Sequence, residues 1–169
     1  MKILVTVASK HGSTTEIAEA IKVELVQYGH DACVVSVEEL ETVEGYDAVV
    51  LGSAIYLGQW MKPAKEFATR QEASLKTLPV WLFSSGPVGD PAKPEDPADR
   101  RQGDKLAETL AARGHMVFHG KVDRDNLSLA ERAIVRMAKA PNSDQRDWSE
   151  IRSWAGEIAA ELDSMVAKG

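Results

Sequence analysis

The sequence predicts a three-layer α/β fold, in which a five-stranded parallel sheet of strand order 2-1-3-4-5 carries helices on both faces. The first observation is a series of short apolar runs, several of them rich in β-branched residues, as is typical of strands covered on both faces. The second is that apolar residues between these runs recur with a period of about 3.6, which indicates amphipathic helices. Strands that alternate with helices join into a parallel sheet through right-handed crossovers.

Five apolar runs are expected to form the strands in chain order. They are Ile3–Ala8, Ala32–Val37, Ala48–Ile55, Val80–Ser84 and Met116–Val122. The helical period follows the first strand in Ile17, Ala18, Ile21 and Leu25, and returns in Leu106, Ala107, Leu110 and Ala111. It is clearest in the last helix, where apolar residues step by three and four: Ile151, Trp154, Ala155, Ile158, Ala159, Leu162, Met165 and Val166. Asp147 and Glu150 form a capping-box pair at the start of that helix.

Two segments interrupt the alternation of strands and helices. Ser85–Pro97 is rich in glycine and proline, which predicts a long loop. Asp123–Arg146 separates the fifth strand from the last helix, where a short connection would have been enough. We therefore expect one domain over residues 1–169, with an insertion at about 123–147 before the C-terminal helix.

The composition is that of an ordinary soluble globular protein, with 44% hydrophobic and 27% charged residues. A net charge of -6 argues against a general nucleic-acid binder, which needs concentrated positive charge. Cys33 is the only cysteine, so the chain forms no internal disulfide, and a small core residue is a simpler interpretation than a catalytic thiol. The apolar stretch before Ser9 and Lys10 is too short for a secretory signal, so we expect a cytoplasmic protein.

Ligands of open α/β sheets bind beyond the carboxyl ends of the strands, near the point where strand order reverses. The first loop at that position, Ser9–Thr15, leads into a helix with a capping-box pair, Ser13 and Glu16. Its hydroxyl groups, its glycine and the exposed N–H groups of the helix start suit a phosphate group. A hydroxyl-rich helix cap that binds nothing is the alternative. Because the loop lacks both G-x-G-x-x-G and G-x-x-x-x-G-K-S/T, a mononucleotide phosphate is the favoured ligand.

Two further loops face the same crevice. The second loop, Gly52–Trp60, follows the third strand and combines two glycines with two aromatic residues. Tyr56 and Trp60 are suited to stack on a planar heterocycle, and equally suited to cover the edge of the sheet. The third loop, Ser84–Asp90, follows the fourth strand, and alone it is a weak signal.

In order and spacing, these three loops resemble the phosphate loop and the two ring-binding loops of flavodoxins. The resemblance covers most of the chain and implies a flavodoxin-like fold that binds one FMN. It implies that the FMN phosphate is held by Ser9, Lys10, His11, Gly12, Ser13 and Thr14. It also implies that the isoalloxazine ring is clasped by Ala54, Ile55, Tyr56, Leu57 and Gly58, and by Ser85, Gly86, Pro87, Val88 and Gly89. Flavodoxins usually have Thr and Asn where this loop has Lys10, His11 and Ser13. This difference from the flavodoxin pattern argues against a simple electron carrier.

Leu127–Trp148 resembles the insertion before the last helix in quinone-dependent protoporphyrinogen oxidases. This resemblance implies an FMN-dependent oxidoreductase, with a porphyrinogen or a quinone as substrate. No catalytic acid or base is expected, because the flavin carries the redox chemistry. The alternative is a non-enzymatic electron carrier of the flavodoxin type, or a flavodoxin-fold interaction module, in which the insertion docks a protein partner.

The charge of the insertion differs from that of the remaining chain. Residues 121–146 contain six basic and four acidic residues, which gives +2 and leaves -8 for the rest. A basic amphipathic helix can meet an anionic partner, such as a propionate-bearing tetrapyrrole or a membrane surface that carries a quinone. The alternative is a surface helix that packs its apolar face on the domain, or on a second subunit of a homodimer. We expect a redox partner or a small-molecule substrate, and no nucleic acid.

Other functional classes lack their characteristic residues. A receiver domain needs an acidic pair after its first strand, where this chain has Ser9 and Lys10. The four histidines are not grouped with each other or with Cys33 at the spacing of metal ligands, so no metal site is expected. The G-x-S-x-G pattern of a nucleophile elbow is missing as well.

Overall fold

The computed structural model describes residues 1–86, 97–123, 125, 127–137 and 143–167. Within these residues the sheet has six strands: β1 (Lys2–Ala8), β2 (Asp31–Ser36), β3 (Ala48–Tyr56), β4 (Gln59–Trp60), β5 (Val80–Ser85) and β6 (Gly114–Phe118). Five of them are parallel and lie in the order β2-β1-β3-β5-β6, whereas β4 pairs antiparallel with β3. Without β4 this is the order 2-1-3-4-5, so the predicted fold class is confirmed.

The register brings the carboxyl ends of the central strands to one edge of the sheet. Ala8 of β1 lies opposite Ser53 of β3, and Ser53 lies opposite Ser84 of β5. Ser84 in turn lies opposite Val117 of β6. The three loops singled out in the sequence therefore leave the sheet at the same edge, as the prediction of a common crevice requires.

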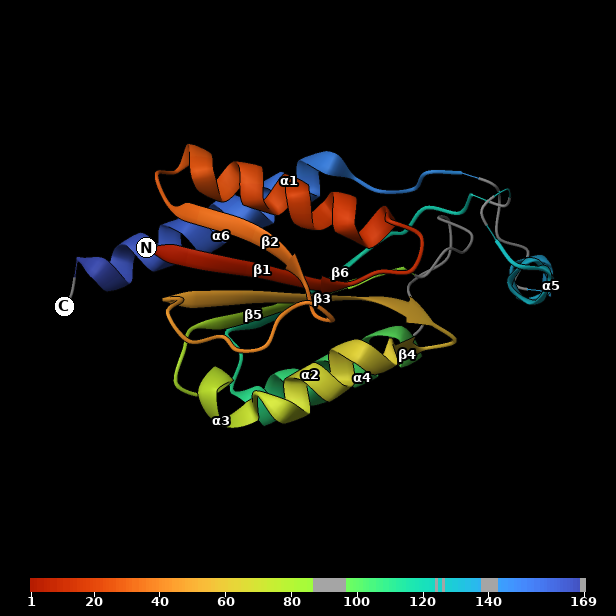
Figure 1. Ribbon diagram of the computed structural model, residues 1–169. Helices are drawn as coiled ribbons and strands as arrows, with labels where there is room; N and C mark the ends of the chain where they lie inside the picture. The colour runs from red at the N-terminus through yellow and green to blue at the C-terminus, as the bar shows by residue number, and fades with distance from the viewer. Residues whose placement is uncertain (87–96, 124, 126, 138–142, 168–169) are drawn as a thin grey trace.

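Helices cover both faces of the sheet (Figure 1). On one face lie α1 (Ser13–Gln27) and α6 (Trp148–Val166), and on the other lie α2 (Lys62–Arg70), α3 (Glu72–Leu75) and α4 (Pro97–Leu110). The apolar stripe of the last helix is buried from Ile151 to Leu162, as its period predicts, whereas Val166 is exposed. Trp154 of this helix forms an aromatic cluster with Phe83 and Phe118 of the sheet. Their ring centroids lie 5.5 to 6.3 Å apart in tilted or edge orientations, and each such pair adds about 0.5–1.5 kcal/mol beyond simple burial.

The structure departs from the predicted elements at two strands. The hairpin of β3 and β4 was not predicted, because β4 is only two residues long. The last strand begins at Gly114 and ends at Phe118, so the predicted extension to Val122 is wrong. After β6 the chain leaves the parallel sheet and pairs antiparallel with a later segment: the Val122 N–H donates to the Ser143 carbonyl (3.0 Å), and the Gln145 N–H donates to the Gly120 carbonyl (3.1 Å).

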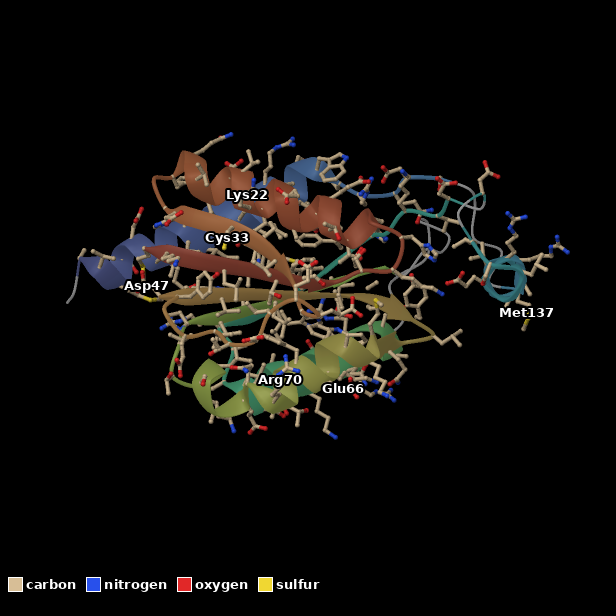
Figure 2. The ribbon with its side chains drawn as sticks, in the orientation of Figure 1. Lys22, Cys33, Asp47, Glu66, Arg70 and Met137 are labelled. Carbon is tan, nitrogen blue, oxygen red and sulfur yellow. The ribbon has the colours of Figure 1, made fainter. Side chains whose placement is uncertain are left out.

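This antiparallel pair, residues 120–122 with 143–145, is the stem of the insertion. Beyond the stem lies α5 (Leu129–Met137), which stands outside the three layers at the carboxyl edge of the sheet (Figure 1). Ser128 and Glu131 form a reciprocal capping box at its start, with distances of 2.8 and 3.3 Å. Figure 2 shows Met137, at the end of α5, far from the body of the sheet.

Candidate functional site

A cleft that is open to solvent lies at the carboxyl ends of β1, β3 and β5. All three loops contribute to its lining, and so does the insertion with its stem. The lining residues are Ser9, His11, Ser13, Thr14, Ala54, Ile55, Tyr56, Ser85, Gly86, Gly120, Lys121, Val122, Leu127 and Val135.

The first loop turns into α1 through a glycine in the left-handed conformation. Gly12 has a φ of +81° and is the N-cap, and its carbonyl accepts from the Glu16 N–H at 2.9 Å. The predicted capping box between Ser13 and Glu16 is wrong, because α1 has no side-chain cap and Glu16 pairs with Arg146 instead. The Ser13 Oγ is consequently buried without a hydrogen-bond partner, and Ser13 lines the cleft.

Four of the six residues predicted for the phosphate line the cleft. Ser9, His11, Ser13 and Thr14 do so, whereas Lys10 and Gly12 belong to the loop without lining it. The first amides of an α-helix have no intrahelical acceptor, so the start of α1 brings unpaired N–H groups to the same place. An orphaned hydroxyl beside unpaired amides is an arrangement that accepts an anion.

The second loop is a tight hairpin. Leu57 and Gly58 are the two turn residues between the paired positions Tyr56 and Gln59, and both have a positive φ, of +51° and +71°. Such turns favour Asn-Gly, so a leucine at the first position is a strained choice. Ala54, Ile55 and Tyr56 line the cleft, whereas Leu57 and Gly58 form the tip of the hairpin and do not.

The third loop reaches the cleft with its first residues. Ser85 and Gly86 line the cleft, and Gly86, with a φ of +97°, donates its N–H to the Phe118 carbonyl (3.0 Å). Pro87, Val88 and Gly89, which complete the predicted ring-binding set, lie outside the described residues.

A polar network, buried except for its last member Asp104, joins the second loop to the third. The Trp60 indole N–H donates to Ser84 Oγ (2.8 Å), Ser84 Oγ lies 2.8 Å from His115 Nε2, and His115 Nδ1 lies 2.7 Å from Asp104 Oδ1. The order Ser–His–Asp is that of a hydrolase triad, but Ser84 is fully buried and cannot meet a substrate. The network instead fixes the two loops relative to each other. For Trp60, packing rather than stacking is the correct interpretation, because its side chain is buried.

The insertion contacts the first loop through Glu131. Lys10 Nζ donates to Glu131 Oε1 at 2.6 Å, and His11 Nε2 lies 3.1 Å from the same oxygen. The hydrogen bonds from Lys10 and Ser128 hold the pKa of the Glu131 carboxyl well below its usual range. Partial burial, and then the charge of Glu131, raise the pKa of the Tyr56 phenol.

The family model described as a flavodoxin domain matches residues 4–149 of the chain. This chain belongs to the flavodoxin domain family. A curated relative, protoporphyrinogen IX dehydrogenase (quinone) of Escherichia coli strain K12, is 25% identical over 181 residues, which cover 99% of this chain and 100% of the relative.

Solved structures share the fold. A flavodoxin from the domain Archaea superposes with a TM-score of 0.66 at 19% identity, over 96% of this chain and 99% of that one. The rubredoxin oxygen:oxidoreductase of the anaerobe Desulfovibrio gigas also superposes with a TM-score of 0.66, at 12% identity, over 98% of this chain and 37% of that protein's chain. Family membership supports a flavoprotein with a redox role that acts with a redox partner.

Several cleft residues of this flavodoxin-family chain were not predicted as site residues. Gly120, Lys121 and Val122 belong to the stem, and Leu127 and Val135 belong to the insertion. The sequence did offer a signal for the stem, because it follows the fifth strand, whose carboxyl end must lie at the same edge of the sheet as the three loops. Leu127 and Val135 carry no such signal, since only the fold of the insertion turns them toward the cleft.

Two negative findings concern the described residues alone. None of their helices is long and apolar enough to cross a membrane. Nor do their His, Cys, Asp and Glu side chains form a group of three or more that could hold a metal ion.

Proposed function

We propose that the chain binds one FMN in the cleft and is an oxidoreductase of the protoporphyrinogen IX dehydrogenase (quinone) type. The observation that carries the proposal is the cleft itself, in which an anion-accepting helix start, an aromatic hairpin and a basic insertion meet. The proposal treats residues 1–169 as one domain, whose insertion at about 123–147 serves the site.

The first loop fits the phosphate of FMN. Ser13 offers a buried hydroxyl that lacks a partner, and the start of α1 offers unpaired amides in line with the positive end of the helix dipole. Gly12 adopts a conformation that lets the chain turn sharply into the helix. Ser9 and Thr14 add hydroxyl groups along the same wall.

The second and third loops fit the ring system. Ala54, Ile55 and Tyr56 supply apolar and aromatic lining, and Ser85 and Gly86 lie beside them on the neighbouring strand. When bound, FMN supplies the electron-transfer chemistry, and the protein supplies position and electrostatics. Leu57 and Gly58 are proposed to set the backbone contact to the ring edge, so a bulkier residue in place of Gly58 is expected to shift the flavin potential or weaken binding.

The insertion is proposed to meet the substrate. The full-length relationship to the Escherichia coli dehydrogenase supports a porphyrinogen or a quinone in this role. Lys121 adds a basic group to the cleft wall, which suits a carboxylate-bearing molecule.

The outer face of α5 is proposed to touch a membrane surface that carries the quinone. Leu129, Ala133 and Met137 recur every four residues on that exposed face, and Leu129 and Met137 are 85% and 84% exposed. Arg132 and Arg136 are exposed beside them and suit anionic headgroups. Co-sedimentation with anionic but not with neutral vesicles tests the contact, and a dimer in solution that buries α5 would contradict it.

A non-enzymatic electron carrier is the second candidate, and the strained hairpin tip favours it. Leu57 is 78% exposed next to the cleft, where a protein partner of an electron carrier would dock. Under this reading the flavin is reduced only through a reductase.

Visible absorption and turnover separate the candidates. The enzyme is expected to be purified with flavin bands, or to acquire them with added FMN, and then to oxidise a porphyrinogen with a quinone as acceptor. A protein that takes up FMN but turns over only with a reductase is a carrier. A colourless protein that does not take up FMN excludes both.

A further inference from the structure

Arg146 ties the end of the insertion to the first loop through a buried guanidinium. Its side chain is 2% exposed, and it binds Asp144 in a bidentate manner, with Nε to Oδ1 at 2.8 Å and Nη2 to Oδ2 at 2.6 Å. Its Nη1 donates to Glu16 Oε2 at 2.7 Å, and the guanidinium lies 4.5 Å from the ring centroid of Trp148. A buried charge with this many partners has one preferred position, since any displacement leaves desolvated groups unpaired.

The same Nη1 also donates to the Ser13 carbonyl, at 3.1 Å. The Ser13 carbonyl and the Thr14 N–H belong to one planar peptide group and point in opposite directions. Thr14 N–H is one of the helix-start amides without an intrahelical acceptor, and both Ser13 and Thr14 line the cleft. A hydrogen bond from a cation to the carbonyl orients this peptide group and strengthens its N–H as a donor.

We infer that Arg146 is a positioning residue for phosphate binding, which aims the Thr14 N–H into the cleft. The inference rests on the proposed FMN site and extends it to a residue that does not line the cleft. Arg146, Asp144 and Glu16 together carry a charge of -1, so the cluster acts through geometry rather than through attraction for the phosphate. The hydrogen bonds that Arg146 donates to Asp144 and Glu16 raise the pKa of its guanidinium, which therefore keeps its charge.

Comparing FMN with riboflavin isolates the phosphate, because the two flavins share the ring and the ribityl chain. Flavin-free protein of the full chain is titrated with each, and the quenching of flavin fluorescence gives two dissociation constants. For Arg146→Gln, the affinity for FMN is expected to fall about 10-fold or more, and the affinity for riboflavin less than about 2-fold. Arg146→Lys keeps the charge and a donor group but lacks the planar fork of the guanidinium, so it is expected to recover part of the FMN affinity.

Arg113→Gln is the matched control. Like Arg146, Arg113 pairs with a carboxylate, since its Nη1 lies 2.6 Å from Glu161 Oε1. Its guanidinium also lies over a tryptophan ring, 6.0 Å from the ring centroid of Trp81. It precedes β6 at the amino ends of the strands, on the side of the sheet away from the cleft. Neither flavin is expected to bind this variant differently. Should Arg146→Gln fail to fold, Glu16→Ala removes the carboxylate that accepts from Arg146 Nη1 at an exposed position, and it is expected to lower the affinity for FMN but not for riboflavin.

The outcomes separate this inference from the function on which it rests. A selective loss of FMN affinity in the Arg146 and Glu16 variants supports it. Equal losses for both flavins, or an unchanged FMN affinity, overturn it and leave the FMN site intact. Wild-type protein that binds neither flavin refutes the proposed function and this inference together.

Discussion

Removing the Glu131 side chain is expected to release α5 from the first loop while the sheet stays folded. Glu131→Ala removes the contact with His11 and two contributions whose size can be stated. The capping box with Ser128 is worth about 1 kcal/mol. The ion pair with Lys10 is worth about 0.2–1 kcal/mol, because the Lys10 side chain is 53% exposed and solvent screens the pair.

The sum of about 1–2 kcal/mol corresponds to a factor of about 5–30 in the equilibrium for local opening of α5. Native-state amide exchange followed by mass spectrometry measures this factor directly. Amides of α5 are expected to exchange about 5–30-fold faster in Glu131→Ala, whereas those of β1 and β3 keep their rates.

Two control variants test whether the faster exchange of α5 comes from the capping box, from the ion pair or from neither. Glu131→Gln keeps an acceptor for the Ser128 N–H and removes the charge, so it is expected to show only the ion-pair part. Glu66→Ala removes an exposed carboxylate that pairs with Lys62 on α2, and it is expected to leave α5 unaffected. The reasoning is refuted if Glu131→Ala leaves α5 exchange unchanged, or if it accelerates exchange throughout the sheet.

Three further predictions concern packing, strain and acid. Gly52→Ala places a Cβ about 2.1 Å from the Phe83 ring, so the free energy of unfolding in urea is expected to drop by about 3 kcal/mol; a loss below about 1 kcal/mol would contradict the packing argument. Leu57→Asn suits the positive φ of its position and is expected to stabilise the protein by about 0.5–1 kcal/mol in the same assay, whereas a loss would show that Leu57 is held by packing. The pKa values of Glu131 and Asp144 are lowered in the folded protein, so their pairs stabilise it above the normal carboxyl range, and this contribution is lost as the pH falls through the lowered values. Exchange of α5, corrected for its intrinsic pH dependence, should therefore accelerate between about pH 5 and pH 2, and a flat profile would count against these pairs.

The strand order and the last helix could be predicted because each rests on a local pattern. The apolar run Ala48–Ile55 is buried on both faces as far as Ala54, in the middle of the sheet, and the Asp147 carboxylate caps α6 as its sequence indicates. The same kind of local pattern led to a wrong prediction at α1, where a capping box was expected and does not form. Ser13 and Glu16 have the correct spacing, but a residue 130 positions away takes Glu16, and no local signal marks that partner.

The candidate site could likewise be predicted only where it depends on local patterns. The first two loops reach the cleft as predicted, because the carboxyl ends of parallel strands must share an edge. The contribution of the insertion was predicted as a segment but not residue by residue. Contacts such as that of Lys10 with Glu131 depend on how the segment between Val122 and Ser143 folds back onto the first loop. Neither hydrophobic periodicity nor composition encodes this. The roles of the individual residues toward FMN stay predictions.

The stem gives the molecule a modular character. Val122 and Ser143 are hydrogen-bonded neighbours, so everything between them starts and finishes at one point of the scaffold. A hairpin turn of two residues is long enough to bridge such a pair. Evolution or a protein engineer can therefore exchange the segment between Val122 and Ser143 as a cassette, while the underlying α/β scaffold keeps its shape.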